Sequence, residues 1–326
     1  MLCLPKATFL RALSICSNAV RCGDCDMAAK KVTETISRPS KSVVRLGLNG
    51  KMGSGWEKWF LLQSDEHWDH PKCDRKLYKE HLDEAIRRDA WIVKNGDLFC
   101  LMQGRYDKRS SRQAIRPEHA TGDNYSDLIL HDAVKFHKPY AHRMLTVGLG
   151  NHETAYEKKY GTNMAQQFVA LLNAESGTSI QAMGYTYWLR LLVSASGKRT
   201  SLRMKCAHGF GGGGPVTRDV IRTARMAVYL PDADIVWTGH THDSWVVPIA
   251  RERILLSDKV TMDYQTHIKT ATYKDEYGAG EGGWHVERGG PPKPIGACWL
   301  RLYINKMQQF DVQYEAIPAL GGSARA

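Results

Sequence analysis

The sequence predicts a mixed α/β fold, on the strength of its composition and of the order of its apolar patterns. A chain of 326 residues that is 43% hydrophobic and 24% charged has enough apolar material for a core, which excludes disorder throughout. From Trp56 to about residue 174, short apolar runs alternate with segments of helical spacing, which predicts strands followed by helices. The second half is richer in strand-like runs, and no repeat of a solenoid type is visible.

The strands and helices can be placed from these patterns. In the first half we expect strands at 58–65, 90–97 and 143–152, and helices at 74–89, 126–141 and 163–174, the first of them capped by Asp74. In the second half we expect one helix at 216–230 and strands at 186–195, 200–208, 233–242, 244–256 and 296–304. Glycine-rich loops are expected at 209–215 and 277–294.

The two ends of the chain differ from its centre. Residues 1–55 are expected to be a disordered or loop-like extension, and Met27 resembles a natural start, so residues 1–26 form an upstream arm in this interpretation. Residues 56–320 are expected to form one domain, and 321–326 a frayed tail. No stretch approaches the ~18 consecutive apolar residues of a membrane helix.

The cysteines and the charge bear on compartment and partners. The eight cysteines lack the short spacings of a disulfide framework, and we interpret them as reduced packing residues of a cytoplasmic protein. Cys22 and Cys25 form a lone C-x-x-C without a second pair. The formal charge of +11 favours nucleic acid, anionic lipid or phosphorylated substrates, with a solvated basic surface as the alternative.

Residue types that bind metals follow five of the predicted strands. In chain order they are Asp65 and His67, then Asp97, then Asn151 and His152, then His208, then His240 and His242. Each motif alone is a weak signal, but open α/β sheets bind ligands at the carboxyl ends of their strands. Nitrogen and oxygen donors without cysteine suit manganese, iron or zinc. Their number suits two ions that share a carboxylate and clamp the oxygens of a phosphoryl displacement.

The order D-x-H, G-D, G-N-H-[D/E], H and G-H-x-H, from Asp65 to His242, resembles the calcineurin-like metallophosphoesterase superfamily. The resemblance implies a four-layer α/β/β/α sandwich, with two central mixed β-sheets flanked by helices, over residues 56–320. It implies that a first metal is held by Asp65, His67 and His242, a second by Asn151, His208 and His240, with Asp97 as the bridge. His152 would be catalytic, protonating the leaving oxygen or stabilising the transition state.

These roles agree with the chemistry of the groups. Two divalent cations, with manganese favoured and iron, zinc or nickel as alternatives, lower the pKa of a bound water enough to supply hydroxide at neutral pH. An imidazole that binds no metal can act as the general acid, which suits His152. We add the hypothesis that Glu153 tunes His152.

The residues around the motifs bear on the substrate. Asp97 is followed by LFCLMQG and not by the Asp-Arg-Gly of Ser/Thr protein phosphatases, so the motif looks more like the nuclease and small-phosphodiester branches. The basic loop 103–117 could grip a polyanion; its candidate contacts are Arg105, Tyr106, Arg109 and Arg112. A solvated loop far from the site is the alternative.

Three functions therefore compete. We favour a metal-dependent phosphodiesterase, a nuclease on DNA or RNA, over a phosphomonoesterase or small-nucleotide phosphatase. A non-catalytic nucleic-acid-binding scaffold is disfavoured, because such a module needs none of the metal-site residues in order. The metal, the choice between DNA and RNA, exonuclease or endonuclease action, and the oligomeric state stay open.

Overall fold

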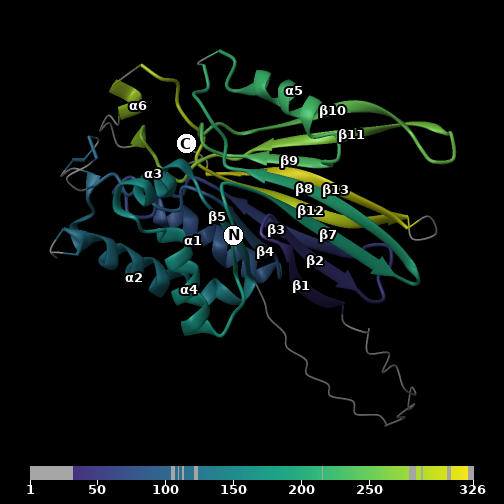
Figure 1. Ribbon diagram of the computed structural model, residues 1–326, viewed down its shortest axis with the longest axis horizontal. Helices are drawn as coiled ribbons and strands as arrows, with labels where there is room; N and C mark the ends of the chain where they lie inside the picture. The colour runs from purple at the N-terminus through teal and green to yellow at the C-terminus, as the bar shows by residue number, and fades with distance from the viewer. Residues whose placement is uncertain are drawn as a thin grey trace, which may run out of the picture.

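The computed structural model describes residues 32–103, 107–108, 110–111, 114–120, 124–214, 216–278, 284–287, 289–306 and 310–321. They form two mixed β-sheets with helices, so the predicted fold class is confirmed (Figure 1). The seven-stranded sheet has the order β1 (Thr33–Ser40), β2 (Val43–Asn49), β7 (Thr186–Ala195), β8 (Lys198–Ala207), β9 (Ile235–Thr238), β11 (Val260–Lys269), β10 (Trp245–Ile254). The six-stranded sheet has the order β13 (Asp311–Leu320), β12 (Gly296–Lys306), β3 (Glu57–Gln63), β4 (Trp91–Asn95), β5 (Met144–Gly148), β6 (Gln181–Ala182).

The helices lie outside the sheets. They are α1 (Arg75–Arg87), α2 (Tyr125–His137), α3 (Asn151–Tyr160), α4 (Met164–Ser176), α5 (Val220–Tyr229) and α6 (Trp284–Glu287), with 3₁₀ turns η2 (Pro117–His119) and η3 (Lys138–Arg143). Figure 1 shows α1, α2 and α4 on one side of the sheets and α5 on the other. The side chain of Asp74 caps α1 by accepting from the Leu77 N–H, as the sequence predicted. None of the described helices is long and apolar enough to cross a membrane.

Two apolar cores join these layers. The first packs α1, α2 and α4 against one face of the six-stranded sheet, with Leu82, Val134 and Phe168 among its fully buried residues. The second fills the space between the two sheets, where Phe60 of β3 meets Leu189 of β7. A smaller cluster around Met226 places α5 over β9 on the outer face of the seven-stranded sheet. The order of layers is therefore helices, sheet, sheet, helix.

Parallel pairing determines where the loops gather. Strands β3, β4 and β5 are parallel neighbours, and so are β8 and β9. The carboxyl ends of parallel neighbours lie at the same edge of a sheet, and ligands bind there. The loops after these five strands carry the metal-binding residue types that the sequence indicated.

The expectation that residues 1–55 are a loop-like extension is wrong for 33–49. This segment forms β1 and β2, and β2 pairs in parallel with β7. Val44, Leu46 and Leu48 alternate inward and are buried between the sheets, whereas the glycines at 47, 50, 53 and 55 had suggested a loop. Residues 1–26, with Cys22 and Cys25, and the tail after Gly321 lie outside the described residues.

Other boundaries also differ from the sequence prediction. The strand expected at 143–152 ends at Gly148, and α3 begins at Asn151, because Gly150 serves as its N-cap. Strands β11 and β13 were not predicted; alternate residues of β11 are exposed along its first half, which weakens the apolar signal. The four described cysteines, Cys73, Cys100, Cys206 and Cys298, are buried, as expected of packing residues.

We predict that Leu46→Ala lowers the free energy of unfolding by about 2–5 kcal/mol, since it opens a cavity between the sheets. Leu256→Ala is the matched control, because that side chain is fully exposed and its loss should change stability by less than about 0.5 kcal/mol. Urea unfolding of both variants measures the difference. Equal stability of the two variants would show that β2 is not part of the core.

Candidate metal centre

The structure brings together every residue that the sequence placed in the metal site. Two groups of donor atoms each lie within 4.8 Å of one another; they are Asp65, His67 and His242, and Asp97, His208 and His240. Asn151 joins the second group, with its Oδ1 2.7 Å from His240 Nδ1 and 3.2 Å from His208 Nε2. These groups match the two sets implied by the sequence resemblance, while their role as metal ligands stays a prediction.

The two central carboxylates each use one oxygen to hold a loop and leave the other at the centre of the site. Asp65 Oδ2 accepts from the Ser64 hydroxyl at 2.6 Å and from the His240 N–H at 2.8 Å, and its Oδ1 is 3.4 Å from His242 Nε2. Asp97 Oδ1 accepts from the His152 N–H at 2.9 Å, and its Oδ2 is 3.2 Å from His208 Nε2. The second oxygen of Asp97 therefore faces His208 in the second group of donors, while its role as a bridge stays a prediction.

Charge inside the site is balanced by its own members. Burial opposes the charged form of Asp97, but His208 and His152 hold the pKa of that carboxyl well below its usual value. Burial also works against a charged His208, yet the carboxylates of Asp97 and Asp65 raise the pKa of its imidazole to about 10. Burial and the charges of His152 and His242 hold the pKa of His67 well below its usual range. In the absence of cations, a positive charge on His208 compensates part of the negative charge of the two carboxylates.

The donor set fits divalent cations. Asp65 Oδ1 is buried and has no hydrogen-bond partner among the described residues. A buried carboxylate oxygen without a donor is costly unless a cation occupies that side. The imidazole, carboxylate and amide donors of the two groups suit manganese, iron or zinc.

Five of these residues have a strained backbone. Positive φ angles occur at Asp65 (59°), His67 (49°), Asp97 (53°), His240 (73°) and His242 (57°). Such conformations are uncommon for residues other than glycine and collect at functional sites, where the surrounding structure maintains them. The strain directs the side chains of successive residues into one centre.

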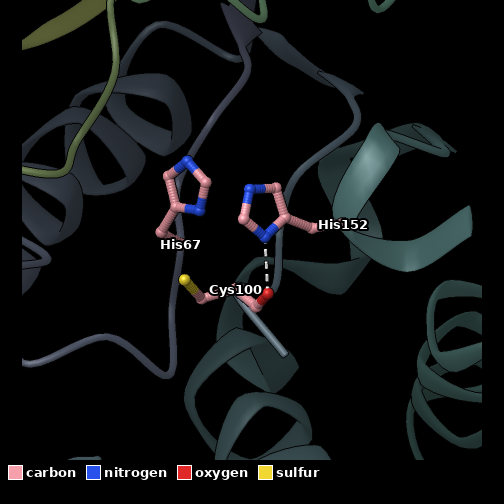
Figure 2. Close-up of side chains that lie close together, drawn as sticks. All are labelled: His67, Cys100 and His152. Carbon is pink, nitrogen blue, oxygen red and sulfur yellow. Dashed lines mark hydrogen bonds between the residues drawn. The ribbon is translucent and has the colours of Figure 1, made fainter. Parts of the chain in front are cut away.

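His152 lies beside the metal-binding groups without being part of them. Its Nδ1 donates a hydrogen bond to the backbone carbonyl of Cys100 at 2.6 Å, as Figure 2 shows. A carbonyl only accepts, so Nδ1 carries the proton and Nε2, 3.8 Å from Asp97 Oδ2, is left to exchange a proton. This arrangement suits a general acid.

Cys100 was interpreted from the sequence as a packing residue, and it is buried. The structure also places it in the site, where it forms a group with His67 and His152 whose donor atoms lie within 4.8 Å of one another (Figure 2). Its position three residues after Asp97 was the signal that could have found it.

Two buried acids outside the metal-binding set hold the loops. Glu153 accepts from the N–H groups of Asp97, Phe99 and Gly150, at 3.0, 2.9 and 2.9 Å. Asp69 accepts from the N–H groups of Cys100 and Leu101 and from the Tyr125 hydroxyl. These contacts of Glu153 are with backbone N–H groups and not with the His152 ring, so its direct role is to fix the loop after β4.

A buried ion pair lies beneath the first loop. Glu66 stands between Asp65 and His67 in sequence, and its Oε1 accepts from Lys94 Nζ at 2.9 Å. Lys94 also donates to Gln63 and to the Tyr78 hydroxyl. Neither Glu66 nor Lys94 was predicted to matter, although a charged residue in an otherwise apolar strand is a signal of such a pair.

The candidate substrate contacts Arg105, Tyr106, Arg109 and Arg112 lie outside the described residues. Arg116, at the end of the same basic segment, donates to the His70 carbonyl at 3.0 Å and pairs with Glu118. It therefore stabilises the loop after β3.

No protein-family model and no curated protein matches the sequence. The chain is similar in structure to Vps29 from Entamoeba histolytica complexed with zinc, at 13% identity over 79% of this chain and 98% of that chain, with a TM-score of 0.33. It is similar to a predicted phosphoesterase from Streptococcus pneumoniae, at 10% identity over 79% of this chain and 89% of that chain, with a TM-score of 0.29. GAP50 of Plasmodium is 13% identical over 80% of this chain and 84% of that chain, with a TM-score of 0.38. These values do not assign the chain to a family.

We predict that Glu153→Gln lowers the free energy of unfolding by about 1–3 kcal/mol in the absence of metal. An amide cannot accept from three N–H groups without presenting a donor to one of them. Glu80→Gln is the control, because Glu80 is exposed on α1. Urea unfolding in EDTA measures both variants, and a Glu153→Gln protein as stable as the control would exclude the role in holding the loops.

Proposed function

We propose that the protein is a hydrolase of phosphate esters that depends on two divalent cations. The observation that carries the proposal is the presence of two groups of nitrogen and oxygen donors, one containing Asp65 and the other Asp97, together with a buried Asp65 oxygen that forms no hydrogen bond with the described residues. The residue types and their order are those that the resemblance to calcineurin-like metallophosphoesterases implied. Manganese is the favoured metal, with iron, zinc or nickel as alternatives.

The chain would hold the first ion with Asp65, His67 and His242, and the second with Asn151, His208 and His240, and Asp97 would contact both. Two such ions, when bound, lower the pKa of water and neutralise charge on the phosphoryl oxygens. His152 would act as the proton donor in its protonated, imidazolium form, because the Nδ1–H bond to the Cys100 carbonyl leaves the Nε2–H facing the site, where it can pass its proton to the leaving oxygen. The amino end of α3, where His152 lies, also favours an anionic group.

The proposed substrate is a phosphodiester of nucleic acid. The net charge of +11 supports a polyanionic substrate, and the lack of Asp-Arg-Gly after Asp97 disfavours a protein phosphatase. A phosphomonoesterase or small-nucleotide phosphatase is the second candidate. It stays in the comparison because the candidate metal-binding groups by themselves suit a phosphomonoester as well as a phosphodiester.

We predict that the manganese-loaded protein hydrolyses bis(p-nitrophenyl) phosphate faster than p-nitrophenyl phosphate. Asp97→Asn should lower either rate by about 10²-fold or more, because the amide cannot bridge two cations. Calorimetric titration with Mn²⁺ should show one strong binding event fewer in this variant. Faster monoester hydrolysis would select the phosphatase, and unchanged activity in Asp97→Asn would exclude the dinuclear centre.

We predict that His152→Asn lowers kcat by about 10²–10⁴-fold for a diester with an alkyl leaving group. The loss should be much smaller for a nitrophenyl leaving group, which departs without a proton. Mn²⁺ affinity should stay unchanged, since His152 is outside the two groups of ligands. Equal losses for both leaving groups would show that His152 is not the acid.

A further inference from the structure

A row of arginines crosses the outer face of the seven-stranded sheet. Arg45 of β2 lies directly opposite Arg190 of β7, and Arg190 lies opposite Arg203 of β8. Adjacent strands are about 4.8 Å apart, and like charges directly opposite each other destabilise a sheet. The row therefore needs negative charge from another source.

The described part of the chain supplies that charge at one end of the row. Arg203 pairs with Asp234 at 3.1 Å and Asp232 at 3.7 Å. No carboxylate of the described residues forms an ion pair with Arg45 or Arg190, and the Arg45 Nε is buried without a hydrogen-bond partner. Two guanidinium groups on an open face are thus left without a counter-charge.

The arginines line two adjoining grooves. The first has a volume of about 570 Å³ and is lined by Arg45, Arg190, Leu192, Ser194, Arg199, Thr200 and Ser201. The second, of about 560 Å³, is lined by Val43, Trp188, Leu189, Arg190, Arg203 and Asp232. Arg190 belongs to both, so the grooves are continuous across the sheet. The surface combines guanidinium groups, hydroxyls and one large aromatic ring.

We propose that this surface, the arginine groove, binds single-stranded nucleic acid. Guanidinium groups pair with phosphate in two-point contacts, and the serine and threonine hydroxyls can donate further hydrogen bonds to phosphate oxygens. Trp188 is partly buried against the Met226 cluster and has Lys205 Nζ 5.1 Å from its ring centroid, so a base that stacks on the ring would displace or adjoin this cation. Exposed sheet faces with aromatic residues recognise single strands by such stacking. In a duplex, the faces of the bases are covered by neighbouring base pairs and cannot stack on such a ring. A small ligand with a single phosphate would occupy only one of the two grooves.

The arginine groove is separate from the metal centre. His208 follows Arg203 by five residues and Arg199 by nine along β8, which corresponds to about 17 and 30 Å at 3.3 Å per residue. Binding there does not depend on the proposed hydrolysis. The chain before the described residues does not complement the groove, because residues 1–31 contain Lys6, Arg11, Arg21, Lys30 and Lys31 against Asp24 and Asp26.

The test measures binding of fluorescein-labelled oligothymidylate, about 12 nucleotides long, by fluorescence anisotropy. The full chain is used in EDTA, so that hydrolysis does not interfere. Arg45→Gln with Arg190→Gln should raise Kd about tenfold or more and reduce the slope of log K against log salt by about 0.7 per lost phosphate contact. The control variant, Lys76→Gln with Lys135→Gln, removes two exposed charges elsewhere and should bind as the unmodified protein does.

A second arm tests the aromatic contact. Trp188→Leu should weaken binding severalfold without changing the salt slope, and Trp188→Phe should retain more of the affinity, because a phenyl ring still stacks. Thermal melting shows whether each variant is folded. If Trp188→Leu is unfolded, the double variant Arg45→Gln with Arg190→Gln still tests the groove. Hydrolysis of a small aryl diester with manganese should be unchanged in the arginine variant, which separates this proposal from the proposed function.

The proposal is overturned when the arginine and lysine pairs weaken binding equally, since that result reflects net charge alone. It is also overturned by a second pattern of results, in which two conditions hold together. Heparin, anionic phosphatidylserine vesicles or a DNA duplex displace the labelled strand as effectively as unlabelled single strand does, and both Trp188 variants bind with the affinity of the unmodified protein. The first pattern would indicate a diffuse basic surface, and the second a general polyanion site.

Discussion

The structure depends on how Asp65 and Asp97 divide their oxygens between the fold and the site. In each, one oxygen accepts from the backbone N–H of a residue in another loop, His240 for Asp65 and His152 for Asp97. The hydrogen bond from the backbone N–H fixes the orientation of the carboxylate, and this orientation directs the other oxygen to the centre of the site. Since both carboxylates are buried, their charge must be compensated there, and His208 does so in part. The bond between Asp65 and His240 thus joins loops of the two sheets, and the bond between Asp97 and His152 joins two loops of the six-stranded sheet.

The glycines of the motifs follow from this close packing. A Cβ at Gly150 would lie 2.0 Å from Asp97 Oδ1, and one at Gly239 would lie 2.4 Å from Asp65 Oδ2. Each glycine precedes metal-binding residues in its own loop, but the space it leaves is filled by the carboxylate of another loop. The motif G-N-H therefore reflects contact with the G-D loop, and G-H-x-H reflects contact with the D-x-H loop. The motifs therefore contain glycines that close packing requires, in addition to the residues that are candidates for binding metal.

The sequence predicted the candidate site better than the fold around it. Asp97 and His208 could be placed together because carboxyl ends of parallel strands share an edge, a rule that needs no knowledge of register. The contribution of Glu153 could not be found in that way, because its three partners are backbone groups of loops whose conformation the sequence does not reveal. Strand β2 was missed because Gly47 interrupts its alternation and further glycines follow at 50, 53 and 55, which together suggested a loop. The arginine row was hidden for a further reason: Arg45 and Arg190 are far apart in the chain and meet only through a parallel register.

The metal centre and the arginine groove have opposite electrostatic needs, and β8 connects them. The candidate centre gathers buried carboxylates whose charge cations would balance, whereas the outer face presents guanidinium groups whose charge phosphate would balance. Arg203 and His208 lie on or directly after the same strand, so the distance between the two regions is set by a rigid element and not by a loop. A ligand that contacted both would have to be extended and carry phosphate at several points along its length, which describes a polynucleotide and excludes a mononucleotide. On this geometry the groove would lower KM for long substrates and leave the reaction of small diesters untouched, because the groups that act on the scissile phosphate are complete without it.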